Sequence, residues 1–252
     1  MPRLNQQLGE IDAAKKDVAA ALERSPNLAA ALEVRALLSG NEGNYKQAIE
    51  DCRELLKVVP KNVQLLSQLG LFHLAAKQPR KAVEFFTTAL ELDPENFVAL
   101  RMRGDSALAY GDHARAVADF AAAYKLKPKD SSLLNNYAWV LATSPDDKVR
   151  DGKLAVELAT AACEETEYKA PHILSTLAAS YAESGDWDNA KKWIGKALEI
   201  GPSAEHLEQL KKESAGYAEK KPWREKQEEQ DAAEPQNRTA AAEKPAESSG
   251  SK

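Results

Sequence analysis

The strongest constraint on the fold is a 34-residue spacing of prolines and small residues. Four prolines keep this step: Pro26, Pro60, Pro94 and Pro128. Two sets of small residues keep it as well: Ala14, Ala48, Ala82 and Ala116, then Ala36, Gly70, Gly104 and Ala138. Between them apolar residues recur at helical spacing, as at Leu65, Leu69 and Phe72. A fixed period of this length predicts a solenoid of short helix pairs, because one pair buries its apolar face only against its neighbours.

The period lengthens after Pro128 because one repeat carries a longer loop. Pro202, the next proline in phase, lies 74 residues further on, and Ala116 and Ala155 are 39 residues apart. The extra residues therefore fall mainly in a loop over residues 143–152. Its aspartates precede a glycine, but the loop lacks the alternating oxygen ligands and the final glutamate of a calcium site. We interpret it as a structural loop.

These repeats resemble the tetratricopeptide-repeat family, in the bacterial form with one long-loop repeat. Residues 63–96 read VQLLSQLGLFHLAAKQPRKAVEFFTTALELDPEN, with Gly70, Ala82, Phe86 and Pro94 in the phase of the family. The resemblance covers about residues 28–204. It implies an all-α, right-handed superhelix of antiparallel helices A and B, whose concave groove is lined mainly by A helices.

Four segments are predicted. Residues 1–27 match an N-terminal half-repeat, because 9–26 read as a complete helix B and only residues 3–8 remain for a helix A. The half-unit indicates either a frayed cap or a protein that extends upstream. Residues 28–204 form the array of about five repeats, residues 205–225 a C-terminal capping helix, and residues 226–252 a disordered tail without apolar periodicity. On the capping helix, Lys211, Lys212 and Glu213 are expected to face water.

The turn between helices A and B carries glycine in several repeats, at Gly43, Gly111 and Gly185. A glycine there supplies the positive φ that such turns require. Lys77 takes this place in the repeat of residues 63–96. We therefore expect a different turn in that repeat.

Composition excludes several classes of function. The net charge is −5 and the sequence pI about 5.6, so no basic face is available to nucleic acid or anionic lipid. The sequence shows neither a signal peptide nor a membrane span, which predicts a cytoplasmic protein. No nucleotide loop, metal motif or nucleophile–base spacing is present, so we expect no enzyme activity, no cofactor, no metal and no small-molecule substrate. Cys52 and Cys163 are interpreted as core residues.

The resemblance assigns the groove to set positions on each helix A. These positions hold Gln64, Ser67, Gln68 and Leu71, then Arg101 and Asp105, then Ser132, Asn135, Asn136 and Trp139, and last His172, Ser175 and Thr176. Their amides and hydroxyls can bond an extended peptide backbone, with Leu71 and Trp139 as apolar anchors. Trp139 has an alternative role in packing against the next helix A. The residues that clamp a C-terminal carboxylate in some members are missing, which disfavours that mode.

The leading hypothesis is a non-catalytic scaffold or adaptor that binds a protein or peptide of unknown identity in the concave groove. The alternative is an accessory segment of a longer multidomain enzyme or sensor, whose catalytic part lies upstream. The half-repeat at the start keeps this alternative open.

Overall fold

The structure is a computed structural model that describes residues 2–225, with side chains from residue 10 onward. The predicted tail, residues 226–252, lies outside the described residues. Within residues 2–225 the chain forms twelve α-helices and no strand. Their bounds are α1 Pro2–Arg24, α2 Ala29–Asn41, α3 Tyr45–Val58, α4 Val63–Ala75, α5 Pro79–Leu92, α6 Phe97–Ala109, α7 His113–Leu126, α8 Ser131–Thr143, α9 Gly152–Glu165, α10 Pro171–Glu183, α11 Trp187–Ile200 and α12 Ala204–Ala218.

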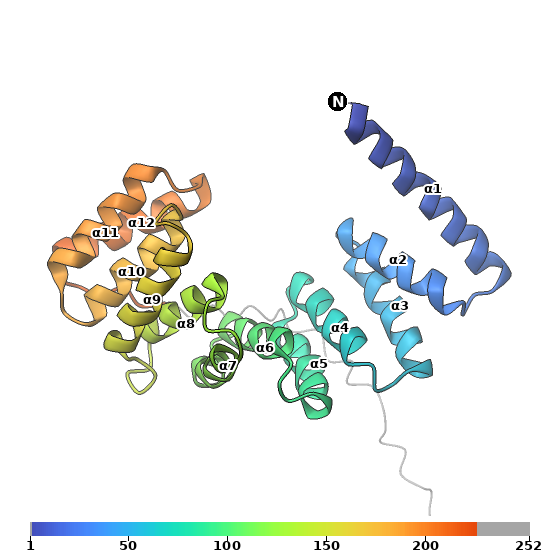
Figure 1. Ribbon diagram of the computed structural model, residues 1–252, viewed down its shortest axis with the longest axis horizontal. Coiled ribbons are helices and arrows are strands. Elements are labelled where there is room, and N and C mark those ends of the chain that lie inside the picture. The colour runs from blue at the N-terminus through green and yellow to red at the C-terminus, as the bar shows by residue number, and fades with distance from the viewer. Residues whose placement is uncertain (1, 226–252) are drawn as a thin grey trace, which may run out of the picture.

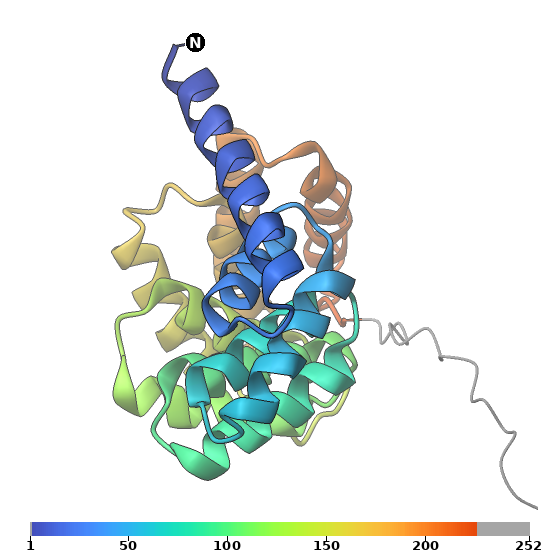
Figure 2. The ribbon, with the colours of Figure 1, turned by 90° about the vertical axis from the view of Figure 1, so that its right-hand side faces the viewer.

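The helices stack as pairs into a curved solenoid, which confirms the predicted fold class (Figure 1). The pairs are α2–α3, α4–α5, α6–α7, α8–α9 and α10–α11. Helices α4, α6, α8, α10 and α12 also contact one another in succession, so the first helix of each pair lies on the concave side. Helix α12 occupies the place of a further first helix and covers the end of the stack. At the other end, α1 packs on α2 and projects away from the stack (Figures 1 and 2).

Asparagine and aspartate side chains begin most of the helices. Asn62, Asn96 and Asp130, spaced by 34 residues, each accept a hydrogen bond from the backbone N–H three residues later. Asn44, Asp112 and Asp186 do the same for second helices. Each bond satisfies one of the donors that a helix start leaves unpaired and is worth about 1 kcal/mol. The repeat therefore encodes helix boundaries as well as a core.

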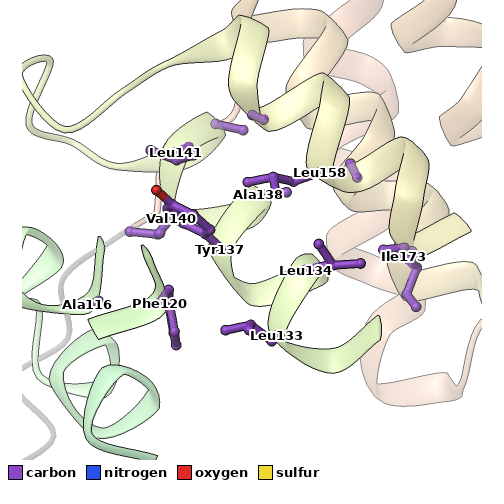
Figure 3. Packing of buried hydrophobic residues seen from close by; sticks show 14 of the residues in the cluster. Ala116, Phe120, Leu133, Leu134, Tyr137, Ala138, Val140, Leu141, Leu158 and Ile173 are labelled. Atoms are coloured by element: carbon purple, nitrogen blue, oxygen red, sulfur yellow. The ribbon is translucent and has the colours of Figure 1, made fainter. Parts of the chain in front are cut away.

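The helices of a pair approach where a phenylalanine ring lies on a glycine. The ring of Phe86 covers Gly70 and the ring of Phe120 covers Gly104, and both rings are fully buried. A Cβ atom added to Gly104 would lie 2.5 Å from a Phe120 ring carbon. Phe120 also lies beside Leu133 and Tyr137 of the next repeat (Figure 3). One contact thus fixes both the spacing within a pair and the packing between pairs.

We predict opposite effects for two glycine-to-alanine substitutions inside helices. Gly104→Ala should destabilise the fold by about 1–3 kcal/mol, because the added methyl group overlaps a buried ring. Gly195→Ala, on the exposed face of α11 with nothing near its Cβ position, should stabilise it by about 0.5–1 kcal/mol through helix propensity. Urea denaturation measures both. Equal shifts of the two midpoints would contradict the ring-on-glycine contact.

The turn at Lys77 has the same conformation as the glycine turns, so the expectation of a different turn is wrong. Lys77 has a φ of 57°, against 78° and 86° at Gly43 and Gly111. The Gln78 N–H donates to His73 O at 2.9 Å, which is the bond that Asp112 N–H makes to Ala107 O in the next pair. The fold imposes the left-handed conformation on a residue that disfavours it.

Replacing Lys77 by glycine should therefore stabilise the protein by about 1 kcal/mol, because it removes the steric penalty of the left-handed conformation. Thermal unfolding of Lys77→Gly tests this stabilisation, with Lys125→Gly, at an exposed position in the last turn of α7, as the comparison. The second variant should lose about 1 kcal/mol. A destabilised Lys77→Gly would show that the lysine side chain supports the turn.

The long loop, residues 144–151, is tied to the stack by hydrogen bonds. Arg150 donates from Nη1 to Ser144 O at 2.8 Å and from Nε to Glu183 Oε1 of α10 at 2.8 Å. The Ser144 hydroxyl lies 2.9 Å from His113 Nδ1 on α7. Asp151 accepts from Leu154 N–H and begins α9. These bonds fit the structural interpretation of the loop.

Both ends differ in detail from the sequence-based expectation. Residues 3–8 continue α1 and do not form a separate helix A. The capping helix ends at Ala218 and not at residue 225. Lys211 and Lys212 face water as expected, but Glu213 is buried at 1% exposure, because that side of α12 packs on α10.

Candidate functional site: a cleft on α8, α10 and α12

A cleft of about 490 Å³ opens on the concave side at the C-terminal end of the stack. Three successive first helices, α8, α10 and α12, form its walls. The lining residues are Asn135, Asn136 and Trp139 of α8, His172, Ser175 and Thr176 of α10, His206, Gln209 and Leu210 of α12, and Glu225.

The α12 wall repeats the α10 wall in the same register. His206, Gln209 and Leu210 lie 34 residues after His172, Ser175 and Thr176. These three residues were not among the predicted groove residues, because the sequence of α12 indicated only a capping helix. Extension of the 34-residue step by one more helix would have found all three.

The structure gathers part of the predicted groove and separates the rest. Asn135, Asn136, Trp139 and His172 line the cleft together. The predicted residues of α4 lie two helix pairs away from the cleft: Gln64, Ser67, Gln68 and Leu71. Ser132 of α8 is exposed and lies outside the cleft. Ser67 is buried and donates its hydroxyl to Val63 O at 2.8 Å, so it presents nothing to a ligand.

Asn136 is engaged by its own chain. Its Nδ2 donates to Asp105 Oδ1 of α6 at 2.8 Å, and its Oδ1 accepts from Asn135 Nδ2 at 3.1 Å. Burial raises the pKa of the Asp105 carboxyl above its usual range, against the opposing effect of this hydrogen bond. Arg101 and Asp105 are not among the residues that line the cleft, and Asp105 is joined to the cleft wall through Asn136.

Trp139 is half-buried, and its indole N–H is bonded within the chain. Trp139 Nε1 donates to Glu225 Oε2 at 3.1 Å, across 86 residues of sequence. Glu225 belongs to residues 222–225, which leave α12 and run back to the end of α8; we call them the return segment. The Glu225 N–H donates to Thr143 O at 2.9 Å. Burial raises the pKa of the Glu225 carboxyl. No sequence pattern pointed to this contact.

A second carboxylate lies behind the cleft wall. Glu213 accepts from the Ser175 hydroxyl at 2.6 Å and from Gln209 Nε2 at 2.8 Å. Burial raises the pKa of Glu213, and these two bonds oppose the shift. The carboxylate fixes one side chain on each of the two opposing walls, so it holds α10 and α12 in register.

Two imidazoles stand at the rim of the cleft. His172 and His206 are both exposed and lie near the starts of α10 and α12. The pKa of His172 is lowered, first by partial loss of water and then by the neighbouring His206. With its pKa lowered, the His172 ring is neutral at pH 7 and can donate or accept a hydrogen bond, and His206 Nδ1 lies 2.7 Å from the Ser203 hydroxyl.

Two further features bear on chemistry within the described residues, the two cysteines and the clustering of possible metal ligands. Burial raises the pKa of the Cys52 and Cys163 thiols to about 12, so neither supplies a thiolate at neutral pH. Between residues 10 and 225, no three His, Cys, Asp or Glu side chains are grouped so that they could hold a metal ion. None of the helices between residues 2 and 225 is long and apolar enough to cross a membrane.

Sequence comparison identifies the repeats. Residues 41–103 and residues 101–148 match two models described as tetratricopeptide repeat. Residues 41–148 are tetratricopeptide repeats. A search of curated protein sequences gave no match.

Solved structures share the tetratricopeptide-repeat fold. PilF of Pseudomonas aeruginosa aligns with a TM-score of 0.65 at 21% identity, over 82% of this chain and 92% of that one. YrrB, described as a TPR protein with an unusual peptide-binding site, aligns at 0.62 and 17% identity, over 77% and 97%. The MamA protein aligns at 0.60 and 19% identity, over 72% and 94%. At these identities the likeness concerns the fold.

The buried carboxylate predicts a pH effect on stability. A carboxyl whose pKa is raised by folding stabilises the native state below its ordinary pKa, and this stabilisation is lost as pH rises through the raised value. Glu213→Gln should therefore reduce the fall in unfolding free energy between about pH 4.5 and pH 8. Urea melts across this range measure it, with exposed Glu205→Gln as the control. A profile as steep as that of the wild type would contradict the raised pKa of Glu213.

Proposed function

We propose that this tetratricopeptide-repeat protein is a non-catalytic scaffold that binds an extended segment of another protein in the cleft of α8, α10 and α12. The cleft itself carries the proposal. It is formed by equivalent positions of three successive helices, so its polar groups recur along a line, as the groups of an extended backbone do. The description of YrrB as a peptide-binding TPR protein supports the same use of the fold.

The chemistry of the cleft suits a peptide. Its walls present amides and imidazoles beside the half-buried face of Trp139, while the Ser175 and Thr176 hydroxyls are bonded within the chain. Neutral polar groups bond a peptide backbone without selecting a charge, and the apolar faces accept occasional side chains. These groups suit recognition of a peptide backbone.

The rest of the concave face extends the proposed groove with a more apolar surface. Leu37 and Leu71 occupy the position of Trp139 in earlier repeats and are 47% and 38% exposed. Val34 and Val98 are also exposed on α2 and α6. A long partner would therefore contact mainly apolar side chains on α2 and α4 and polar side chains at the cleft. Gln64 and Gln68 also lie on α4.

We predict that the double substitution His172→Ala with His206→Ala weakens partner binding about tenfold, equivalent to about 1.4 kcal/mol. The two rings lie on opposite walls and are exposed, so their loss leaves the core intact. Asn136 and Trp139 are less suitable targets, because their substitution also breaks bonds within the chain. The measurement is capture of partners by immobilised full-length protein, followed by calorimetry on the protein recovered.

The matched control is Lys125→Ala with Lys191→Ala, two exposed residues of the second helices α7 and α11. This variant should bind as the wild type does, and circular dichroism should show equal helix content in all three proteins. Unchanged affinity in the histidine variant would refute the cleft as the binding site.

A further inference from the structure

The return segment reaches the edge of the cleft, where Glu225 lines it, through a defined turn and not as a loose end. After α12, Lys220 adopts a left-handed φ of 57°. The Lys221 N–H donates to Gly216 O at 2.8 Å and the Lys220 N–H to Tyr217 O at 3.2 Å. This pair of bonds closes a Schellman turn, which reverses the chain toward the concave side. Because lysine disfavours this conformation, contacts beyond the turn must support the reversed path.

Those contacts begin with the backbone of α8. The last carbonyls of a helix lack partners within the helix and remain available to another chain. Thr143 O accepts the Glu225 N–H at 2.9 Å, and Ala142 O accepts from Arg224 Nη1 at 3.3 Å. The return segment thus binds α8 through groups that any extended peptide with a basic side chain can present.

Three consecutive side chains then occupy three different environments. Trp223 packs against the apolar core. Arg224 Nη2 donates to Glu183 Oε2 at 2.5 Å, on a carboxylate that also accepts from Arg150 of the long loop. Glu225 accepts the Trp139 indole N–H. The site therefore recognises an apolar side chain, a base and an acid in sequence.

The return segment is held weakly at its C-terminal residue, Glu225. The Glu225 carboxylate is half-buried and accepts a hydrogen bond from one neutral donor, the Trp139 indole. Desolvation of a carboxylate is only partly offset by a single neutral hydrogen bond. The acid end is therefore the part of the segment that an incoming ligand can replace most readily.

We propose that the return segment is an internal ligand of the cleft, and that the partner displaces it with an extended segment that also presents a base followed by an acid. The proposal rests on the proposed function for the use of the cleft. It adds a mode of regulation and a partner chemistry. A segment joined to α12 by only a short turn competes at an effective concentration on the order of millimolar, so it masks the site from weak ligands.

The test uses a synthetic fluorescent peptide with the sequence of residues 219–228, EKKPWREKQE, and full-length protein. Arg224→Ala with Glu225→Ala in the protein should weaken the internal ligand, and the peptide should then bind about tenfold more tightly than to the wild type. A peptide with the same two substitutions should lose about tenfold in affinity for that variant. Fluorescence anisotropy measures both. Glu225→Ala alone is the second variant if the double substitution reduces helix content.

Equal peptide affinities for wild type and variant, or equal affinities of the two peptides, would overturn the internal ligand and identify the segment as a fixed part of the cap. The result is separable from the proposed function. If the histidine variant loses the captured partner while Arg224→Ala with Glu225→Ala leaves partner affinity unchanged, the cleft binds its partner and the internal ligand is refuted. If the peptide competes as expected but the histidine variant keeps its partner, only the proposed function fails.

Discussion

The structure depends on one recurring contact, a phenylalanine ring of one helix against a glycine of its partner. The missing side chain lets the two axes approach, and the ring then reaches the next repeat. The contact occurs in two neighbouring pairs, α4–α5 and α6–α7, 34 residues apart, and small residues at the same positions of the other pairs keep the helices similarly close. Equivalent residues consequently fall in line on the concave side. The cleft is a result of this alignment and requires no special local fold.

Much of the fold was predictable from the sequence, because the repeat period, the residues at helix ends and the small residues between helices are local signals. The longer spacing between Ala116 and Ala155 placed the loop correctly between α8 and α9. The turn at Lys77 was not predictable from its residue type, since packing of α4 on α5 overrides the preference of lysine. Glu213 was misplaced because three polar residues in succession suggested a solvated face, whereas one of them points to α10.

The residues of the candidate site likewise fall into those that the sequence predicted and those that it did not. Asn135, Asn136, Trp139 and His172 came from the repeat register, and His206 was available from one further step of it. The place of Glu225 in the cleft was not predictable from the sequence, because it depends on a reversal of the chain and on a contact across 86 residues. The hydrogen bond from Asn136 to Asp105 was also not predictable, since it joins residues 31 apart on neighbouring helices. Register predicts which face a residue occupies, and only coordinates show which partner it has.

Helix α12 closes the stack and also forms one wall of the cleft. This double role restricts how the array can change in length. A repeat duplicated between α2 and α7 lengthens the solenoid and leaves the walls at α8, α10 and α12 intact. A repeat inserted after α11 separates His206 from His172 and moves the return segment away from Trp139. Growth of the array is therefore compatible with the cleft only on its N-terminal side, and relatives with additional repeats there should keep the same end.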